Sequence, residues 1–209
     1  MKPLFLLLTL ATAAAAAEPA GSCGAPAPGP ADGSCCCAAV PASAYSRRSL
    51  YQADVAFTTD GGRAFRLGEL RGRPVVVALF FASCGYACPL IVADLQAVRA
   101  RLPDALRERA AFVLVSFDVA RDTPAALARY REQRGLDAGW ILLHGPDDSV
   151  RELAALLGVK YKQEADGGFA HSNLFTILDA EGEIVHQRVG LKGGLDEAVA
   201  ALAKAGTAR

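Results

Sequence analysis

A run of seven apolar residues leads into two closely spaced cysteines, and this stretch constrains the fold more than any other. Residues 75–81 include three valines and two phenylalanines, which is typical of a strand buried on both faces of a sheet. After a short break that carries Cys84, apolar residues recur from Cys88 onward at helical spacing. Pro89 suits a first helical turn, where its missing N–H would have no partner. The two thiols are therefore expected where a buried strand turns into a helix.

This position favours thiol chemistry. Backbone N–H groups and the positive end of the helix dipole are expected to point at the two sulfurs. Such surroundings lower a thiol pKa and favour the thiolate, which is the form that binds metals and attacks disulfides. Three residues separate Cys84 from Cys88, whereas thioredoxin-type reductases have two. With Cys84 in the loop and Cys88 in the first helical turn, the sulfurs can close to a disulfide or share a metal ion, and the spacing leaves both open.

Length and charge set broad limits on the chain. Its 209 residues are enough for one sizeable core, so we expect one folded domain. Lys and Arg together number 22, as do Asp and Glu, and no basic patch stands out. Nucleic acid is therefore not an expected partner.

The first residues resemble an export signal. Lys2 precedes an apolar run that ends in alanines before Glu18, and the run is shorter than the roughly 20 residues of a membrane-spanning helix. We interpret residues 1–17 as a signal peptide, 18–45 as a flexible linker rich in Ala, Pro and Gly, and 46–209 as the folded domain. The protein is then expected in the periplasm or at an extracytoplasmic membrane face. A lipid anchor at Cys23 is the minor alternative.

The six cysteines are unevenly placed. Only Cys84 and Cys88 belong to the expected domain, so a disulfide framework does not hold it together. The early ones are either incidental in a linker, which we favour, or an auxiliary site for a soft metal ion. They are Cys23, Cys35, Cys36 and Cys37.

The rest of the chain alternates strands and helices. Thr123 and Pro124 are a helix start that should run to Gly135, and the sequence 149–152 fits a capping box for the next helix. Residues 167–172 are predicted to form a Gly-rich loop. The remaining expected elements are a hairpin at 56–59 and 63–66, a helical turn at 67–70, strands at 111–117, 140–143, 173–179 and 183–189, and a final helix at 195–202.

This order predicts an α/β protein of the thioredoxin-like class. A strand–helix–strand half is followed by an antiparallel hairpin and a closing helix, with extra elements inserted between the halves. We expect a central mixed sheet flanked by helices, with the first hairpin as an N-terminal extension. The thiols at the end of the first buried strand favour this fold over other α/β arrangements.

One of the three histidines has the right place in this fold to join the thiols. The loop that carries His171 precedes the second hairpin and is expected across from the thiol turn, although a loop histidine can simply bond a backbone carbonyl. His144 and His186 lie at or within strands and are expected to be structural or exposed. Two thiolates and one imidazole suit Cu(I), whereas structural zinc usually takes four ligands.

Three stretches in this order resemble the Sco/SenC family of copper chaperones, which help to assemble cytochrome c oxidase. The resemblance spans about residues 54–205 and rests on 81–89 (FASCGYACP), on 116–118 with 121–124, and on 171–172 with the strand that ends at 179. It implies that Cys84, Cys88 and His171 bind one copper ion, as Cu(I) or Cu(II). It also implies that the protein delivers copper to the CuA site of an oxidase subunit, or reduces the cysteines of that subunit before loading.

Some positions depart from the family pattern. Ala170 stands where the family often has Asp before its histidine, so the groups that orient His171 differ here. Val119 stands where many members have Pro. Asp118 is expected to pair with Arg121 or to cap the turn after its strand, and Tyr86, between the thiols, is expected to be exposed.

The residues support two main hypotheses. In the first, the protein is a metallochaperone with a Cys84, Cys88 and His171 site. In the second, it is an extracytoplasmic thiol-disulfide oxidoreductase in which Cys84 attacks and Cys88 resolves, served by a thioredoxin-like reductant and with no need of His171. A methionine-based copper carrier is excluded, because Met1 is the only methionine.

Overall fold

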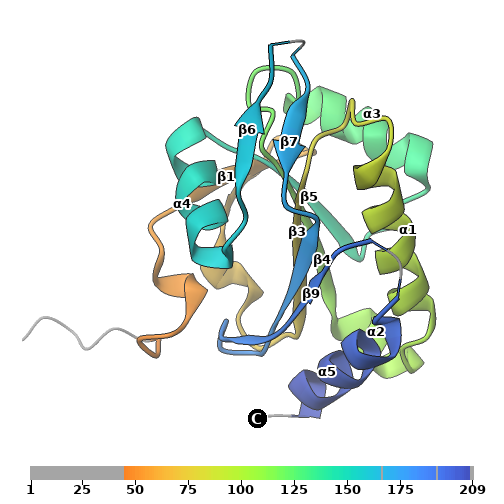
Figure 1. Cartoon of the computed structure of the whole chain (residues 1–209). Coiled ribbons are helices and arrows are strands. Elements are labelled where there is room, and N and C mark those ends of the chain that lie inside the picture. The colour runs from red at the N-terminus through yellow and green to blue at the C-terminus, as the bar shows by residue number, and fades with distance from the viewer. Residues whose placement is uncertain (1–44, 166, 192, 208–209) are drawn as a thin grey trace, which may run out of the picture. The chain divides into compact units, whose positions relative to one another are not determined.

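The computed structural model describes residues 45–165, 167–191 and 193–207 (Figure 1). The predicted signal peptide, all but the last residue of the predicted linker, and the four early cysteines lie outside these residues and stay predictions. Among the described residues, no helix has both the length and the apolar character needed to cross a bilayer.

A seven-stranded mixed sheet forms the centre of the fold, in the order β2-β1-β5-β4-β3-β8-β9. Strand β3 pairs in parallel with β4 and antiparallel with β8, and all residues of β3 and β4 are buried. This confirms the predicted central strand. The sheet strands are β1 (Ala56–Thr59), β2 (Ala64–Arg66), β3 (Val75–Phe80), β4 (Ala111–Ser116), β5 (Trp140–His144), β8 (Leu174–Leu178) and β9 (Ile184–Val189).

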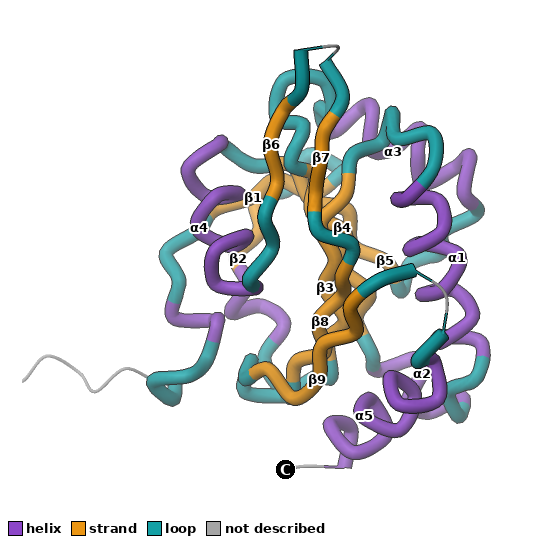
Figure 2. The backbone as a smooth tube through the Cα atoms, viewed as in Figure 1, coloured by secondary structure: helices purple, strands orange, loops and turns teal. Residues whose placement is uncertain are grey.

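Helices cover both faces of this sheet. On one face, the guanidinium of Arg99 in α1 lies over Phe112 of β4, and Tyr130 of α3 packs against Phe80 of β3; α5 packs beside α1. Helix α4 lies on the other face (Figures 1 and 2). The α-helices are α1 (Ala87–Ala100), α2 (Asp104–Arg109), α3 (Pro124–Arg134), α4 (Asp147–Leu157) and α5 (Leu195–Thr207), and η1 (Leu50–Gln52) and η2 (Leu67–Leu70) are short 3₁₀ helices. The predicted thioredoxin-like fold is confirmed.

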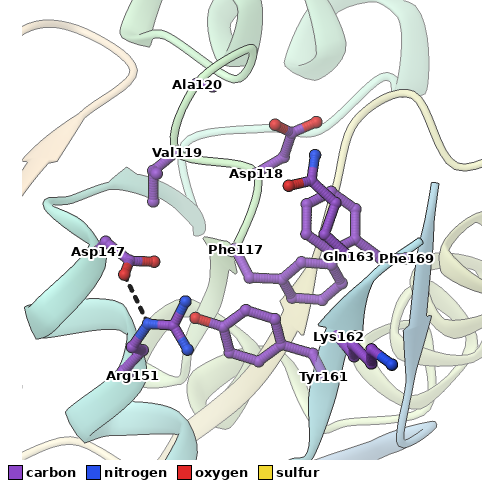
Figure 3. A pocket seen from close by; sticks show the side chains of 10 residues that line it. All are labelled: Phe117, Asp118, Val119, Ala120, Asp147, Arg151, Tyr161, Lys162, Gln163 and Phe169. Carbon is purple, nitrogen blue, oxygen red and sulfur yellow. Dashed lines mark hydrogen bonds and ion pairs between the residues drawn. The ribbon is translucent and has the colours of Figure 1, made fainter. Parts of the chain in front are cut away.

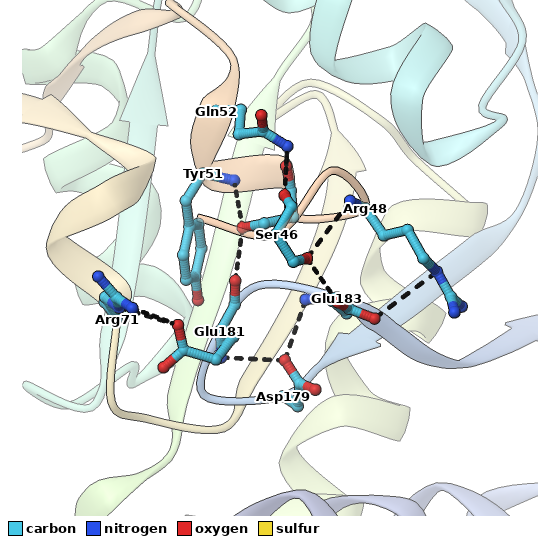
Figure 4. Close-up of polar contacts among 9 residues, drawn as sticks. Ser46, Arg48, Tyr51, Gln52, Arg71, Asp179, Glu181 and Glu183 are labelled. Atoms are coloured by element: carbon cyan, nitrogen blue, oxygen red, sulfur yellow. Dashed lines mark hydrogen bonds and ion pairs between the residues drawn. The ribbon is translucent and has the colours of Figure 1, made fainter. Parts of the chain in front are cut away.

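The segment before β1 is fastened to the turn between β8 and β9 (Figure 4). Ser46 donates its hydroxyl hydrogen to the carboxylate of Glu183, and Ser49 donates to the carbonyl oxygen of Glu181, each across 2.5 Å. Arg71, which follows η2, forms an ion pair of 2.6 Å with the Glu181 carboxylate. These contacts attach the first described residues to the turn between β8 and the edge strand β9.

Helix α3 has the predicted ends, whereas the predicted start of α4 is wrong. Thr123 accepts a hydrogen bond from the N–H of Ala126, and Gly135 ends α3 with a φ of 60°. Helix α4 begins at Asp147 rather than after a capping box at 149–152, because two acidic side chains already suit its first turn. The Ser149 hydroxyl instead accepts a hydrogen bond from the N–H of Ala56 in β1.

The predicted loop at 167–172 is also wrong. Residues 169–171 of this stretch form β7 (Phe169–His171), which pairs antiparallel with β6 (Tyr161–Gln163). Tyr161 lies opposite His171, and Gly167 in the turn has a φ of 81° that favours glycine. The hairpin is a separate two-stranded sheet, so its position over the central sheet depends on contacts other than the hydrogen bonds of that sheet.

Candidate metal centre

Two thiols and one imidazole converge at the carboxyl end of β3. Each offers one ligand atom, and these atoms of Cys84, Cys88 and His171 lie within 4.8 Å of one another. The Sγ atom of Cys88 lies 3.8 Å from Nε2 of His171. The predicted convergence of residues 83 positions apart in the chain is therefore present, with the thiols on the turn into α1 and the imidazole at the end of β7.

The turn after β3 gives the two thiols different surroundings. The N–H of Cys84 donates to the carbonyl of Phe81 across 3.2 Å, and the Cys84 side chain is half-buried. Cys88 lies in the first turn of α1 and is completely buried. Neither thiol is paired in a disulfide in this structure. Tyr86, between them, is 71% exposed as predicted.

The two thiols also differ in acidity. Partial burial would raise the pKa of Cys84, but hydrogen bonds from the backbone N–H groups of Cys88, Tyr86 and Ala87 bring this pKa below its ordinary value. Burial raises the pKa of Cys88 far above its ordinary value, and the neighbouring Cys84 and Asp122 add to the rise. The expectation that the helix end favours the thiolate is met at Cys84 and wrong at Cys88, because burial outweighs the dipole there.

The imidazole of His171 is oriented by the backbone of the next residue. Its Nδ1 atom lies 3.1 Å from the carbonyl oxygen of Ser172. A proton on Nδ1 satisfies that carbonyl and leaves the Nε2 lone pair directed at the sulfurs. The two interpretations of His171, a histidine bonded to a backbone carbonyl and a metal ligand, are thus compatible. His144 and His186 lie in β5 and β9, outside this cluster.

An aromatic cluster packs around the imidazole. The ring of Phe117, just after β4, lies 5.1 Å from that of His171 and stacks on Tyr161 at 4.9 Å. Phe81 and Phe169 complete the cluster, each about 5 Å from the Phe117 ring. These side chains wall off one side of the site from water. Nothing in the sequence distinguishes Phe117 from an ordinary core residue, so this role was not predicted.

A buried carboxylate ties the thiol turn to β4. Asp122 accepts hydrogen bonds from the Ser116 hydroxyl at 2.6 Å and from the N–H of Ala82 at 2.8 Å. It is 3% exposed, and burial raises its pKa even though both hydrogen bonds lower it. From the sequence, Asp122 belonged to a helix start and to the stretch 121–124 of the family resemblance, and its contact with the thiol turn was not predicted. The prediction that Asp118 pairs with Arg121 is confirmed, and the N–H of Arg121 also donates to the Asp118 carboxylate.

An open pocket of about 220 Å³ is lined in part by the aromatic cluster (Figure 3). It lies between the loop after β4, the first turns of α4 and strand β6. Phe117, Tyr161 and Phe169 form one wall. Arg151 lies beside Tyr161, 5.8 Å from the centre of its ring, and pairs with Asp147 at 2.5 Å. None of the three candidate ligands lines this pocket, so it is separate from the metal centre.

Comparisons with known proteins find a matching family and a relative. Residues 43–205 match the protein family described as SCO1/SenC. A protein of Stutzerimonas stutzeri named "Putative copper-binding protein" is 29% identical over 133 residues, which are 61% of this chain and 64% of that relative. The chain thus spans less than two thirds of that relative's length.

Solved structures share the fold at low sequence identity. Bradyrhizobium japonicum ScoI with copper bound is 22% identical with a TM-score of 0.59, and the match covers 72% of this chain and 96% of that one. BsSco, described as having a disulfide switch and as a member of the Sco family of cytochrome c oxidase assembly proteins, is 20% identical with a TM-score of 0.65. That match covers 74% of this chain and 92% of BsSco.

Proposed function

The chain belongs to the SCO1/SenC family, and on that premise we propose that it is a copper metallochaperone that holds one copper ion through Cys84, Cys88 and His171. The observation that carries the proposal is the convergence of three ligand atoms within 4.8 Å. Thiolates select Cu(I) and imidazole suits both copper oxidation states. Copper is the cargo here, so binding must be tight enough to keep it from water and open enough to release it.

The unequal exposure of the thiols supports an ordered release. Cys84 is half-buried and lies beside the exposed Tyr86, whereas Cys88 is completely buried. A thiol of a partner protein approaches the ion from the Cys84 side and replaces that ligand first. Exchange of the remaining ligands one at a time then moves the ion without freeing it into solution.

We further propose that the partner is the copper-site subunit of a cytochrome c oxidase, with its CuA site as the destination. The description of BsSco as belonging to a family of oxidase assembly proteins supports this proposal. The apolar run ending in alanines at 1–17 supports export, so that the two proteins would meet in the periplasm or at the outer face of a membrane.

The acidity of Cys84 favours a second candidate function, the reduction of a partner disulfide. The Cys84 thiolate would attack one partner sulfur, and the other would leave as a thiolate and take a proton. The Cys88 sulfur, on losing its proton, would then attack Cys84, which forms the Cys84–Cys88 disulfide and releases the second partner thiol. Two electrons pass to the partner, and a thioredoxin-like reductant would restore the pair.

Copper titration of the His171→Ala variant separates the two functions. If the chain is a metallochaperone with this site, the variant loses copper affinity, and X-ray absorption shows sulfur neighbours without the nitrogen neighbour seen in the unmodified protein. His186→Ala, in β9 and outside the cluster, is the matched control and should bind copper as the unmodified protein does. Unchanged affinity and coordination in His171→Ala, with disulfide reduction intact, would leave only the oxidoreductase.

A further inference from the structure

The hairpin that carries His171 needs a fastening to the rest of the domain. Strands β6 and β7 are hydrogen-bonded to each other as a separate sheet, and each has only three residues. Packing of Tyr161, Phe169 and His171 on Phe117 holds one face of this hairpin. Aromatic packing alone allows sliding, because it has little directional preference compared with a hydrogen bond.

Arg121 supplies a directional contact at the turn of the hairpin. Its guanidinium donates to the carbonyl oxygen of Gly167 across 2.5 Å and lies 5.9 Å from the centre of the Phe169 ring. The same guanidinium donates to the carboxylate of Asp118, two residues after β4. Asp118 is only 2% exposed and accepts a further bond from the N–H of Arg121. One side chain thus joins a buried residue of the loop after β4 to the turn of the hairpin.

From these contacts we infer that Arg121 is a positioning residue for His171: it holds the β6–β7 hairpin so that the imidazole stays over the two thiols. The inference rests on the proposed copper function for its consequence, but the fastening itself is a property of the metal-free chain. Loss of Arg121 frees the turn at Gly167, four residues before His171, and the imidazole then spends less time within reach of the sulfurs. Cys84 and Cys88, on another element, are unaffected.

This role can be separated from a general effect on stability. The Arg121 side chain is 47% exposed but its partner Asp118 is 2% exposed, so Arg121→Ala also leaves a buried carboxylate unpaired and lowers the free energy of unfolding. Copper binding by the folded protein and local hydrogen exchange in the hairpin distinguish positioning from this general loss. Arg129 lies eight residues further along the chain, at an exposed position of α3. The structure shows no ion pair between it and the other described residues. Arg129→Ala therefore removes the same charge without touching the hairpin.

The test compares Arg121→Ala, Arg121→Lys and Arg129→Ala. We expect Arg121→Ala to bind Cu(II) about tenfold more weakly, the lower end of the range for groups that orient a ligand, and to lose nitrogen hyperfine structure from its electron paramagnetic resonance spectrum. Arg121→Lys, with one charged group for two acceptors, should recover part of the affinity. In the metal-free protein, hydrogen exchange at the β6–β7 amides should quicken in Arg121→Ala and stay unchanged in Arg129→Ala.

A double-variant cycle with His171→Ala decides whether Arg121 acts through the imidazole. If it does, Arg121→Ala causes no further loss of affinity once His171 is gone. The same tenfold loss in that background, or equal hydrogen exchange in Arg121→Ala and Arg129→Ala, would overturn the inference. Should His171→Ala alone leave copper affinity unchanged, the proposed function would fail instead, and hydrogen exchange in the metal-free chain would still decide whether Arg121 holds the hairpin.

Discussion

The backbone N–H of Cys88 donates a hydrogen bond to the Sγ atom of Cys84 across 3.3 Å. This bond, with those from Tyr86 and Ala87, more than offsets burial and lowers the pKa of Cys84. Burial dominates at Cys88 and raises its pKa. Cys84 and Cys88 are therefore unequal nucleophiles. The free N–H groups at the start of α1 point at the Cys84 sulfur, whereas the Cys88 sulfur is buried.

Alkylation of the reduced, metal-free protein should reveal this difference. We expect iodoacetamide to modify Cys84 first, with a rate that reaches half its maximum below the ordinary thiol pKa of about 8.5. Cys88 should react slowly until the protein unfolds, since it is buried as well as less acidic. Mass spectrometry of the labelled peptides over a pH series gives both rates. Equal labelling of the two thiols in the folded protein would contradict the assignment.

The carboxylate of Asp122 should make stability depend on pH. Burial raises its pKa in the folded state, so the folded chain holds this proton more tightly than the unfolded chain. Its contribution to stability is then fully present below the ordinary carboxyl pKa of about 4 and is lost as the pH rises through the raised value. Asp122→Asn cannot ionise, so the free energy of unfolding of the variant minus that of the unmodified protein should increase from acid toward neutral pH.

Urea unfolding at several pH values measures this difference. Glu132→Gln, at an exposed position of α3, is the control and should give a difference that changes little with pH. A flat profile for Asp122→Asn would show that the carboxylate titrates normally despite its burial.

The elements that place the thiols could be predicted because their sequence signals are local. Seven apolar residues at 75–81 and the helical spacing after Pro89 predicted β3 and α1, and both are observed. His171 was found through the fold class: once the order of elements indicated a thioredoxin-like sheet, the chain before β8 had to pass the thiol turn. Its supporting contacts depend on the three-dimensional arrangement and leave no such signal.

The errors have physical causes. The hairpin of β6 and β7 has strands of three residues, too short for an alternation to be recognised. Helix α2 was not predicted because it has no buried side chain and therefore no apolar stripe. Asp122 and Arg121 stand in a stretch that reads as a helix start, and their hydrogen bonds to Ala82 and Gly167 join segments about 40 residues or more apart in the chain.

The aromatic cluster around His171 can be tested with two phenylalanine substitutions, one in β4 and one just after it. Phe117 and Phe112 are both buried, but only Phe117 contacts the ring of His171; Phe112 packs on Trp140. Phe117→Leu and Phe112→Leu should each lower the free energy of unfolding by about 1 kcal/mol, because most of the apolar volume is kept. Only Phe117→Leu should also weaken copper binding. Equal copper affinities for the two variants would show that Phe117 does not position the imidazole of His171.

The ion pair between Arg188 and Asp94 should be the most costly polar contact to break. The Arg188 side chain is 6% exposed and lies 3.0 Å from the Asp94 carboxylate of α1. It also donates to the carbonyl oxygens of Gly190 and Gly193, and so fastens the loop between β9 and α5. Arg188→Ala leaves a mostly buried carboxylate and two carbonyls without their donor, which should cost about 3 kcal/mol.

Chemical denaturation of three variants tests this expectation. Arg101→Ala removes an arginine from an exposed pair with Asp196 and should cost no more than about 1 kcal/mol. Asp94→Asn combined with Arg188→Ala should be more stable than Arg188→Ala alone, because the uncompensated charge is gone. The carbonyls of the loop still lack their donor, so the recovery should be incomplete. If Arg188→Ala and Arg101→Ala prove equally stable, the ion pair between Arg188 and Asp94 contributes no more to the free energy of unfolding than a surface ion pair does.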